Sequence, residues 1–178
     1  MNLQAADALY FDGGTDTYIA ETSADILDII VGGDTMMKLS EKGGDGNEVH
    51  FGASCAGFTQ LEPTYDSGST AVAFRHSNKQ NLTFGAGNIT HLVLTFPLVS
   101  GNFQLLIKQD GTGSRTLTGS YKVLAFDEAA ASGSAIVVFA GGSNPTLTTD
   151  ANHVDILSFY WDADNEIAYG VATLDFQF

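Results

Sequence analysis

The chain has 178 residues, with 21 Asp and Glu against seven Lys and Arg, so its formal net charge is −14. A protein binds nucleic acid by neutralising phosphates with cations, so this charge argues against a nucleic-acid partner. The 44% hydrophobic content and the three prolines are typical of a folded soluble protein. No apolar run approaches the roughly 20 residues that span a bilayer, and we expect no membrane insertion.

The first fifty residues predict a short-stranded β segment rich in Gly and Asp. They hold ten acidic residues against two lysines, and we expect them to pack on the main domain or on copies of themselves, because the strands are too short to bury a core alone. An alternative for residues 23–30 is one helix, with Ser23 as its N-cap. Residues 1–7 lack a basic leader and an apolar stretch, so we expect no secretion. Short strands are predicted at residues 9–11, 17–19, 26–31 and 36–39.

Residues 51–178 predict one antiparallel β-sandwich or jelly-roll-like domain. Twenty glycines, often beside Asp or Asn, mark tight turns between segments rich in Val, Ile, Thr, Phe and Tyr. Residues 103–108 alternate in polarity and are expected to form a hairpin with residues 115–118. A second hairpin is expected from residues 156–161 and 171–178, with a polar tip between them. Further strands are predicted at residues 92–96, 121–126 and 136–140.

Candidate catalytic and metal-binding residues are scarce. The four histidines lack the spacing that places two imidazoles on one helix face, so we expect neither a metal nor another cofactor. His91 and His153 each lie near a predicted strand and are interpreted as hydrogen-bonding residues at strand ends. The lone Cys55 excludes an intrachain disulfide and is expected to be a small core residue.

Two loops and two residue types suggest chemistry at first sight. Residues 110–115 contain glycines as a phosphate-binding loop does, but they lack its lysine and its following helix, so a plain turn is expected. Residues 162–166 lack the central Gly and the distal Glu of a Ca²⁺ loop and are expected to form a solvated hairpin tip. No serine stands in a nucleophile elbow. Two of the many carboxylates could still lie at glycosidase spacing, and the sequence leaves that open.

Aromatic residues gather near the predicted 162–166 tip. Trp161 and Tyr169 are the candidate glycan contacts, because an aromatic ring can stack on a sugar. Tyr160 and Trp161 point to opposite faces of their strand, so at most one of them can join an aromatic platform.

Several segments resemble a known family. LLIKQDGTGSRT at residues 105–116, FAGGSNPTLTTDANHVDIL at 139–157 and YGVA at 169–172 follow one another in the order of a C-terminal module. That module is common in tailed-bacteriophage fibre and virion surface proteins, especially those of marine phages and cyanophages. LYFDGGTDTYI at residues 9–19 is similar to the short repeated segments of such fibre shafts.

The resemblance implies a non-enzymatic structural protein on the exterior of a tailed phage, either a short fibre or a capsid decoration protein. It implies a homotrimer that is made in the host bacterial cytoplasm and resides on the virion surface, with capsid or tail proteins and a host surface glycan as further partners. Residues 1–50 would provide the assembly contact and residues 51–178 the exposed head. The alternative is a free carbohydrate-binding or adhesin-type β-sandwich, and a small glycan depolymerase is a third reading.

Overall fold

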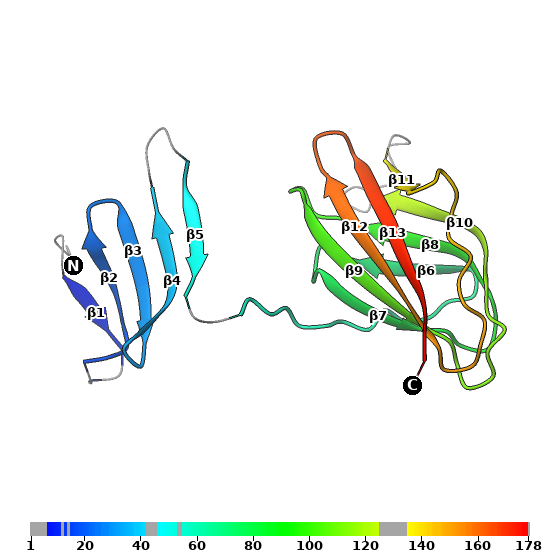
Figure 1. Cartoon of the computed structure of the whole chain (residues 1–178), viewed down its shortest axis with the longest axis horizontal. Coiled ribbons are helices and arrows are strands. Elements are labelled where there is room, and N and C mark those ends of the chain that lie inside the picture. The colour runs from blue at the N-terminus through cyan, green and yellow to red at the C-terminus, as the bar shows by residue number, and fades with distance from the viewer. Residues whose placement is uncertain are drawn as a thin grey trace. The chain divides into compact units, whose positions relative to one another are not determined.

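The computed structural model describes residues 7–11, 13, 15–41, 46–52, 55–124 and 135–177 (Figure 1). Thirteen β-strands and no helix occur in these ranges, which confirms the all-β prediction. No helix there is long and apolar enough to cross a membrane. The first six residues, to which the leader prediction applied, and residues 125, 126 and 178, the ends of two predicted strands, lie outside the described ranges.

The chain divides into two compact units, Met1–Gly57 and Phe58–Phe178. The first unit extends past residue 50 because its last strand, β5 (Glu48–Phe51), pairs with β4 (Asp34–Ser40). The division therefore falls after this strand and not at residue 50.

The N-terminal unit is one antiparallel sheet in the order β1-β2-β3-β4-β5. Its first three strands are β1 (Ala8–Tyr10), β2 (Tyr18–Ser23) and β3 (Ile26–Val31). Gly32 and Gly33 join β3 to β4 with φ of 61° and 84°, a two-residue turn that suits the twist of a hairpin.

The helix alternative for residues 23–30 is wrong. Ser23 pairs with Ile26 across a tight turn in which Asp25 has a φ of 63°, a left-handed value that ends any helix. Ile26, Ile29 and Ile30 are β-branched and pack well on a pleated surface, which favours the strand.

The C-terminal unit consists of two packed sheets, and Figure 1 shows them as two layers. The three-stranded sheet has the order β10-β8-β6 and the five-stranded sheet the order β11-β13-β12-β9-β7. The strands of the first are β6 (Ser69–Ala73), β8 (Ile89–Thr95) and β10 (Leu117–Leu124). Those of the second are β7 (Lys79–Thr83), β9 (Gly101–Lys108), β11 (Ile136–Phe139), β12 (Val154–Asp162) and β13 (Ile167–Phe176).

One apolar core lies between these two sheets. Val72, Leu92 and Leu94 from the smaller sheet share it with Leu105, Leu157 and Phe159 from the larger one. Aromatic rings connect the layers, because Phe74 lies 5.3 Å from Phe103 and 5.8 Å from Phe159 between ring centroids. The unit is therefore β-sandwich-like, as the sequence predicted.

The pairing of the strands is mixed and not purely antiparallel. β9, β12 and β13 are antiparallel neighbours, whereas β7 runs parallel to β9 and β11 runs parallel to β13. In the smaller sheet, β6 and β10 both run parallel to β8. Strands β5, β6 and β7 were not predicted from the sequence.

Of the two predicted hairpins, one is confirmed and one is wrong. β12 and β13 pair across the tip at residues 163–166. β9, by contrast, pairs with β12 and β7, and the chain after it crosses to the other sheet as β10. The buried Gln109 side chain directs this crossing, since its Nε2 donates to the carbonyl oxygens of Arg115 at 2.9 Å and Thr148 at 2.7 Å.

Candidate functional site

One face of the N-terminal sheet carries a continuous apolar row. Residues paired across neighbouring strands project from the same face. Leu9 pairs with Ile19, Ile19 with Ile29, Ile29 with Met37 and Met37 with Phe51. The row thus crosses all five strands, and the Phe51 side chain at its end is 44% exposed.

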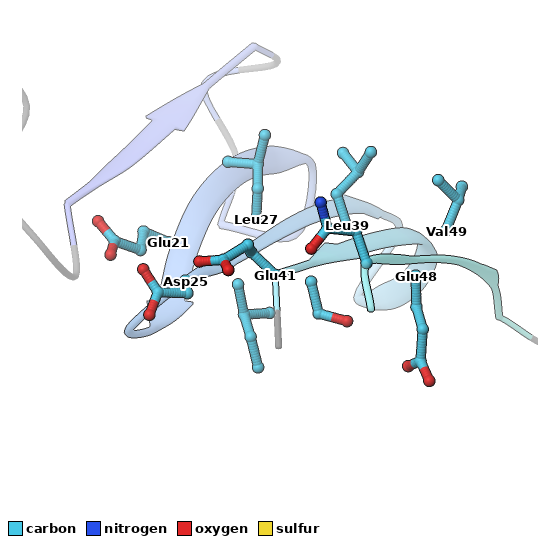
Figure 2. A pocket seen from close by; sticks show the side chains of 10 residues that line it. Glu21, Asp25, Leu27, Leu39, Glu41, Glu48 and Val49 are labelled. Carbon is cyan, nitrogen blue, oxygen red and sulfur yellow. The ribbon is translucent and has the colours of Figure 1, made fainter. Parts of the chain in front are cut away.

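A second apolar row lies beside the first. Leu27 pairs with Leu39, and Leu39 pairs with Val49. Figure 2 shows these three side chains projecting to one side of the sheet, whereas Glu48 projects to the other. Leu27 is 42% exposed and Val49 is 58% exposed, so this face has no covering layer within the described part of its own unit.

A hollow of about 470 Å³ lies at the end of the sheet where β2 turns into β3 and where β4 ends. The apolar side chains of Leu27, Leu39 and Val49 contribute to its lining, together with carboxylates at its margin. Those carboxylates belong to Glu21, Asp25, Glu41 and Glu48 (Figure 2). The hollow therefore combines apolar side chains from one face with carboxylates, of which Glu48 projects from the opposite face.

The opposite face of the sheet is built differently. Asp28 pairs with Lys38, and Lys38 pairs with His50, which places a polar row across its middle. The Asp28 carboxylate is buried, accepts a hydrogen bond from the Thr22 hydroxyl and lies 3.9 Å from the Lys38 ammonium. This face is therefore mixed, because Tyr10, Tyr18 and Ile30 form an apolar row beside the polar one, whereas the rows of the other face are mostly aliphatic.

The structure separates the two predicted glycan contacts. Trp161 is 2% exposed and packs in the sandwich core, so its ring cannot reach a glycan and that prediction is wrong. Tyr169 is 47% exposed on the outer face of the larger sheet. It lies directly opposite Tyr160, which is 51% exposed and which the sequence analysis did not select. A tip at residues 163–166, which pairs Asp162 with Ile167, brings these two positions into register, whereas the predicted tip at 162–166 would place Tyr160 opposite Ala168.

The prediction for Cys55 is also wrong, because this residue is exposed. It follows β5 in the chain and belongs to no strand.

The two histidines singled out from the sequence form hydrogen bonds. His153 directly precedes β12, and its Nδ1 lies 2.7 Å from the Asp175 carboxylate. Nδ1 of His91 lies 3.3 Å from the Ser120 hydroxyl. His91, however, lies within β8 and not at its end. Asp150, His153 and Asp175 place one ligand atom each within 4.8 Å of one another, the one such group among the described residues that could hold a metal ion. Within this group, His153 and Asp175 bond directly to each other.

The loop at residues 110–115 is a plain turn, as predicted. The Asp110 carboxylate accepts hydrogen bonds from the N–H groups of Thr112 at 3.0 Å and Gly113 at 2.7 Å, so the chain's own anion occupies these donors. Arg115 binds the same carboxylate at 2.9 Å, and its hydrogen bond holds the Asp110 pKa below the usual value, with the two N–H groups adding to the effect. The predicted tip at residues 162–166 is confirmed too, since the Asn165 side chain donates to Asp162 and lowers its pKa.

The buried Asp155 carboxylate links the loop before β12 to the last residues of β13. Asp155 is 2% exposed and accepts hydrogen bonds from the N–H groups of Thr148 at 2.7 Å and Asp175 at 3.0 Å. Burial raises the pKa of the nearby Tyr121 hydroxyl, and the negative charge of Asp155 raises it further. This acid therefore has a structural role.

Comparison of the chain with family models, curated proteins and solved structures finds no match.

Proposed function

We propose that the chain is a non-enzymatic structural protein that assembles with copies of itself through the apolar face of its N-terminal sheet. The sandwich unit is then the exposed head. The observation that supports this role is the row from Leu9 to Phe51, which crosses all five strands and ends in a half-exposed phenyl ring.

A single sheet needs a second layer to bury its apolar face. Full burial of an exposed Leu or Phe side chain is worth about 1.5–3 kcal/mol, and each copy offers several partly exposed ones. The N-terminal sheets of neighbouring copies present the same apolar rows and can cover one another. Three copies around a common axis would bury these rows together, and we propose this trimer as the assembled form.

The setting on the exterior of a tailed phage rests on the sequence resemblance of residues 9–19, 105–116, 139–157 and 169–172. In that setting the protein is a short fibre or a capsid decoration protein that contacts capsid or tail proteins. Many copies on one particle would act together through their effective concentration, so each contact can be weak. The acidic charge suits this location, because it prevents binding to the phage genome.

The experiment compares two neighbouring residues of β5 that project from opposite faces. Val49→Asp places a carboxylate on the apolar face, and His50→Asp places one on the polar face of the same strand. Light scattering of the wild type should give about three times the 18.8 kDa chain mass. Val49→Asp should give the monomer mass, whereas His50→Asp should retain the trimer, because only the former buries a charge in the contact.

Two results would contradict the proposal. A wild type that stays monomeric at every concentration tested would exclude self-assembly, and an equal mass for both variants would place the contact elsewhere. The virion setting is tested separately by sedimenting the labelled protein with empty heads or with tails of the phage that encodes it. Co-sedimentation supports that setting, and its absence from both contradicts it, whatever the oligomeric state.

A further inference from the structure

The outer face of the larger sandwich sheet holds a second open hollow, of about 430 Å³. It lies over strands β7, β9, β12 and β13, on the side away from the core. Its polar and aromatic lining side chains are Lys79, Asn102, Gln104, Ser158, Tyr160 and Tyr169.

Strand register arranges these side chains in two rows. In the first row, Asn102 pairs with Tyr160, and Tyr160 pairs with Tyr169. Paired residues of antiparallel strands have Cβ atoms about 4.5–5.5 Å apart, so the two half-exposed tyrosines project from neighbouring positions on one face of the sheet. The row thus offers two tyrosine side chains and, beside them, the Asn102 amide.

The second row runs alongside and is mostly polar. Gln104 pairs with Ser158 and with Lys79, and the Lys79 ammonium donates a hydrogen bond to the Gln104 side-chain oxygen. Val171 ends the row opposite Ser158 and is 53% exposed. Amide and hydroxyl groups, which both donate and accept hydrogen bonds, therefore line the tyrosine row on one side.

The lining of this hollow carries little charge. The chain has a net charge of −14, yet no Asp or Glu is among the residues that line this hollow. Lys79 is its one charged side chain, and that ammonium already donates to Gln104. The hollow of the N-terminal sheet, by contrast, has four carboxylates in its lining.

We infer that this outer face binds a neutral oligosaccharide. The C–H face of a pyranose ring can stack on the Tyr160 and Tyr169 rings, while the sugar hydroxyls bond to Asn102, Gln104 and Ser158. An open hollow lined by two exposed tyrosines and by neutral polar groups fits an extended ligand held by such contacts. The overall negative charge of the chain disfavours an anionic glycan. This binding site goes beyond the proposed assembly role and does not depend on it.

The test uses the full chain and a panel of named probes. Calorimetric titrations would be run with the hexasaccharides of cellulose, laminarin, amylose, β-mannan and chitin, with hexagalacturonate as the anionic probe. We expect at least one neutral probe to bind. Tyr160→Ala and Tyr169→Ala should each weaken that binding about tenfold or more, because each removes half of the stacking surface.

Three matched variants make the result specific. Tyr169→Phe keeps the ring and should keep most of the affinity, which separates stacking from a merely structural role. Tyr10→Ala removes a tyrosine of the N-terminal unit that is 49% exposed, and it should leave affinity unchanged. Gln104→Leu removes an amide and should weaken binding. Unchanged melting curves would show that each variant is folded.

The proposal is overturned if no neutral probe binds at millimolar concentration, or if both tyrosine-to-alanine variants bind as the wild type does. Binding of hexagalacturonate alone, lost in Lys79→Met but kept in Tyr169→Ala, would also overturn it, because the cation would then be the determinant. Light scattering of Tyr169→Ala distinguishes this site from the assembly contact. The mass of this variant should equal that of the wild type. A failure of the glycan proposal can then be distinguished from a failure of the assembly proposal.

Discussion

The indole nitrogen of Trp161 donates a hydrogen bond of 2.9 Å to the carbonyl oxygen of Pro97. The same ring stacks on Phe96, with 4.8 Å between the centroids and an interplanar angle of 10°. Trp161 belongs to β12 of the larger sheet, whereas Phe96 and Pro97 directly follow β8 of the smaller one. A single side chain thus joins the two layers by ring packing and by a hydrogen bond.

We expect Trp161→Ala to lower the free energy of unfolding of the sandwich by about 3–5 kcal/mol, since it leaves a large cavity and an unpaired carbonyl group. Tyr160→Ala on the adjacent outward position should cost less than about 1 kcal/mol. Trp161 is the one tryptophan of the chain, so urea unfolding should be followed by circular dichroism. Equal losses for the two variants would contradict the assignment of Trp161 to the core.

Asp155 supports a second prediction, because its two carboxylate oxygens each accept a hydrogen bond from a backbone N–H group. In Asp155→Asn one acceptor becomes an NH₂ donor that faces another donor. We expect a loss of about 2–3 kcal/mol in the free energy of unfolding. Asp164→Asn makes the same change of charge at the exposed tip and should be nearly neutral.

The Asp155→Asn variant has an independent readout in Tyr121. Removing the negative charge should lower the pKa of that hydroxyl, although burial keeps it above its ordinary value of 10.0. Ultraviolet titration of the tyrosines against the wild type would detect this. An unchanged titration together with unchanged stability would show that Asp155 does not form these contacts.

Local patterns predicted the strands better than their partners. The alternation of residues 156–161 and 171–178 around a polar tip indicated the β12–β13 hairpin, because both strands and the turn are close in sequence. The same kind of pattern at residues 103–118 was misleading. There the path of the chain depends on the contact from Gln109 to Thr148, 39 residues away, and no local signal reports such a contact.

Alternation has a second limit, which the candidate site illustrates. It places Tyr160 and Trp161 on opposite faces of one strand, but it does not say which face is the core. That depends on the second layer, where Phe96 and Pro97 receive the indole ring. For the same reason, the sequence indicated short apolar strands in the N-terminal unit but not the five-strand row, which requires the register of each pair.

Gly113 provides a third prediction, because the turn leaves no room for a side chain at this position. Its φ is 72°, and a Cβ atom there would lie 2.6 Å from the Thr149 carbonyl oxygen and 2.7 Å from the Ala151 nitrogen. Gly113→Ala should therefore destabilise the sandwich by about 1–3 kcal/mol. Gly111 lies two residues earlier in the same turn, and a Cβ atom there would meet nothing within 4 Å. Gly111→Ala should stay within about 0.5 kcal/mol of the wild type in thermal or urea unfolding, and equal effects would contradict the argument.

The Asp110–Arg115 pair predicts a pH dependence whose sign follows from the lowered pKa. The folded state holds the Asp110 pKa below its ordinary value of 3.8, first through the Arg115 hydrogen bond. A lowered pKa stabilises the folded protein when the carboxyl group is ionised in both states, above pH 3.8, and that stabilisation disappears as the pH falls through the folded value. The wild type should therefore be more stable than Arg115→Gln at neutral pH, and the difference should shrink below about pH 4. Lys122→Gln removes one exposed cation elsewhere on the sandwich and should show no comparable change with pH. Urea midpoints measured from pH 7 downwards would test this, and a constant difference between the wild type and Arg115→Gln into the acid range would show that the pair does not set the Asp110 pKa.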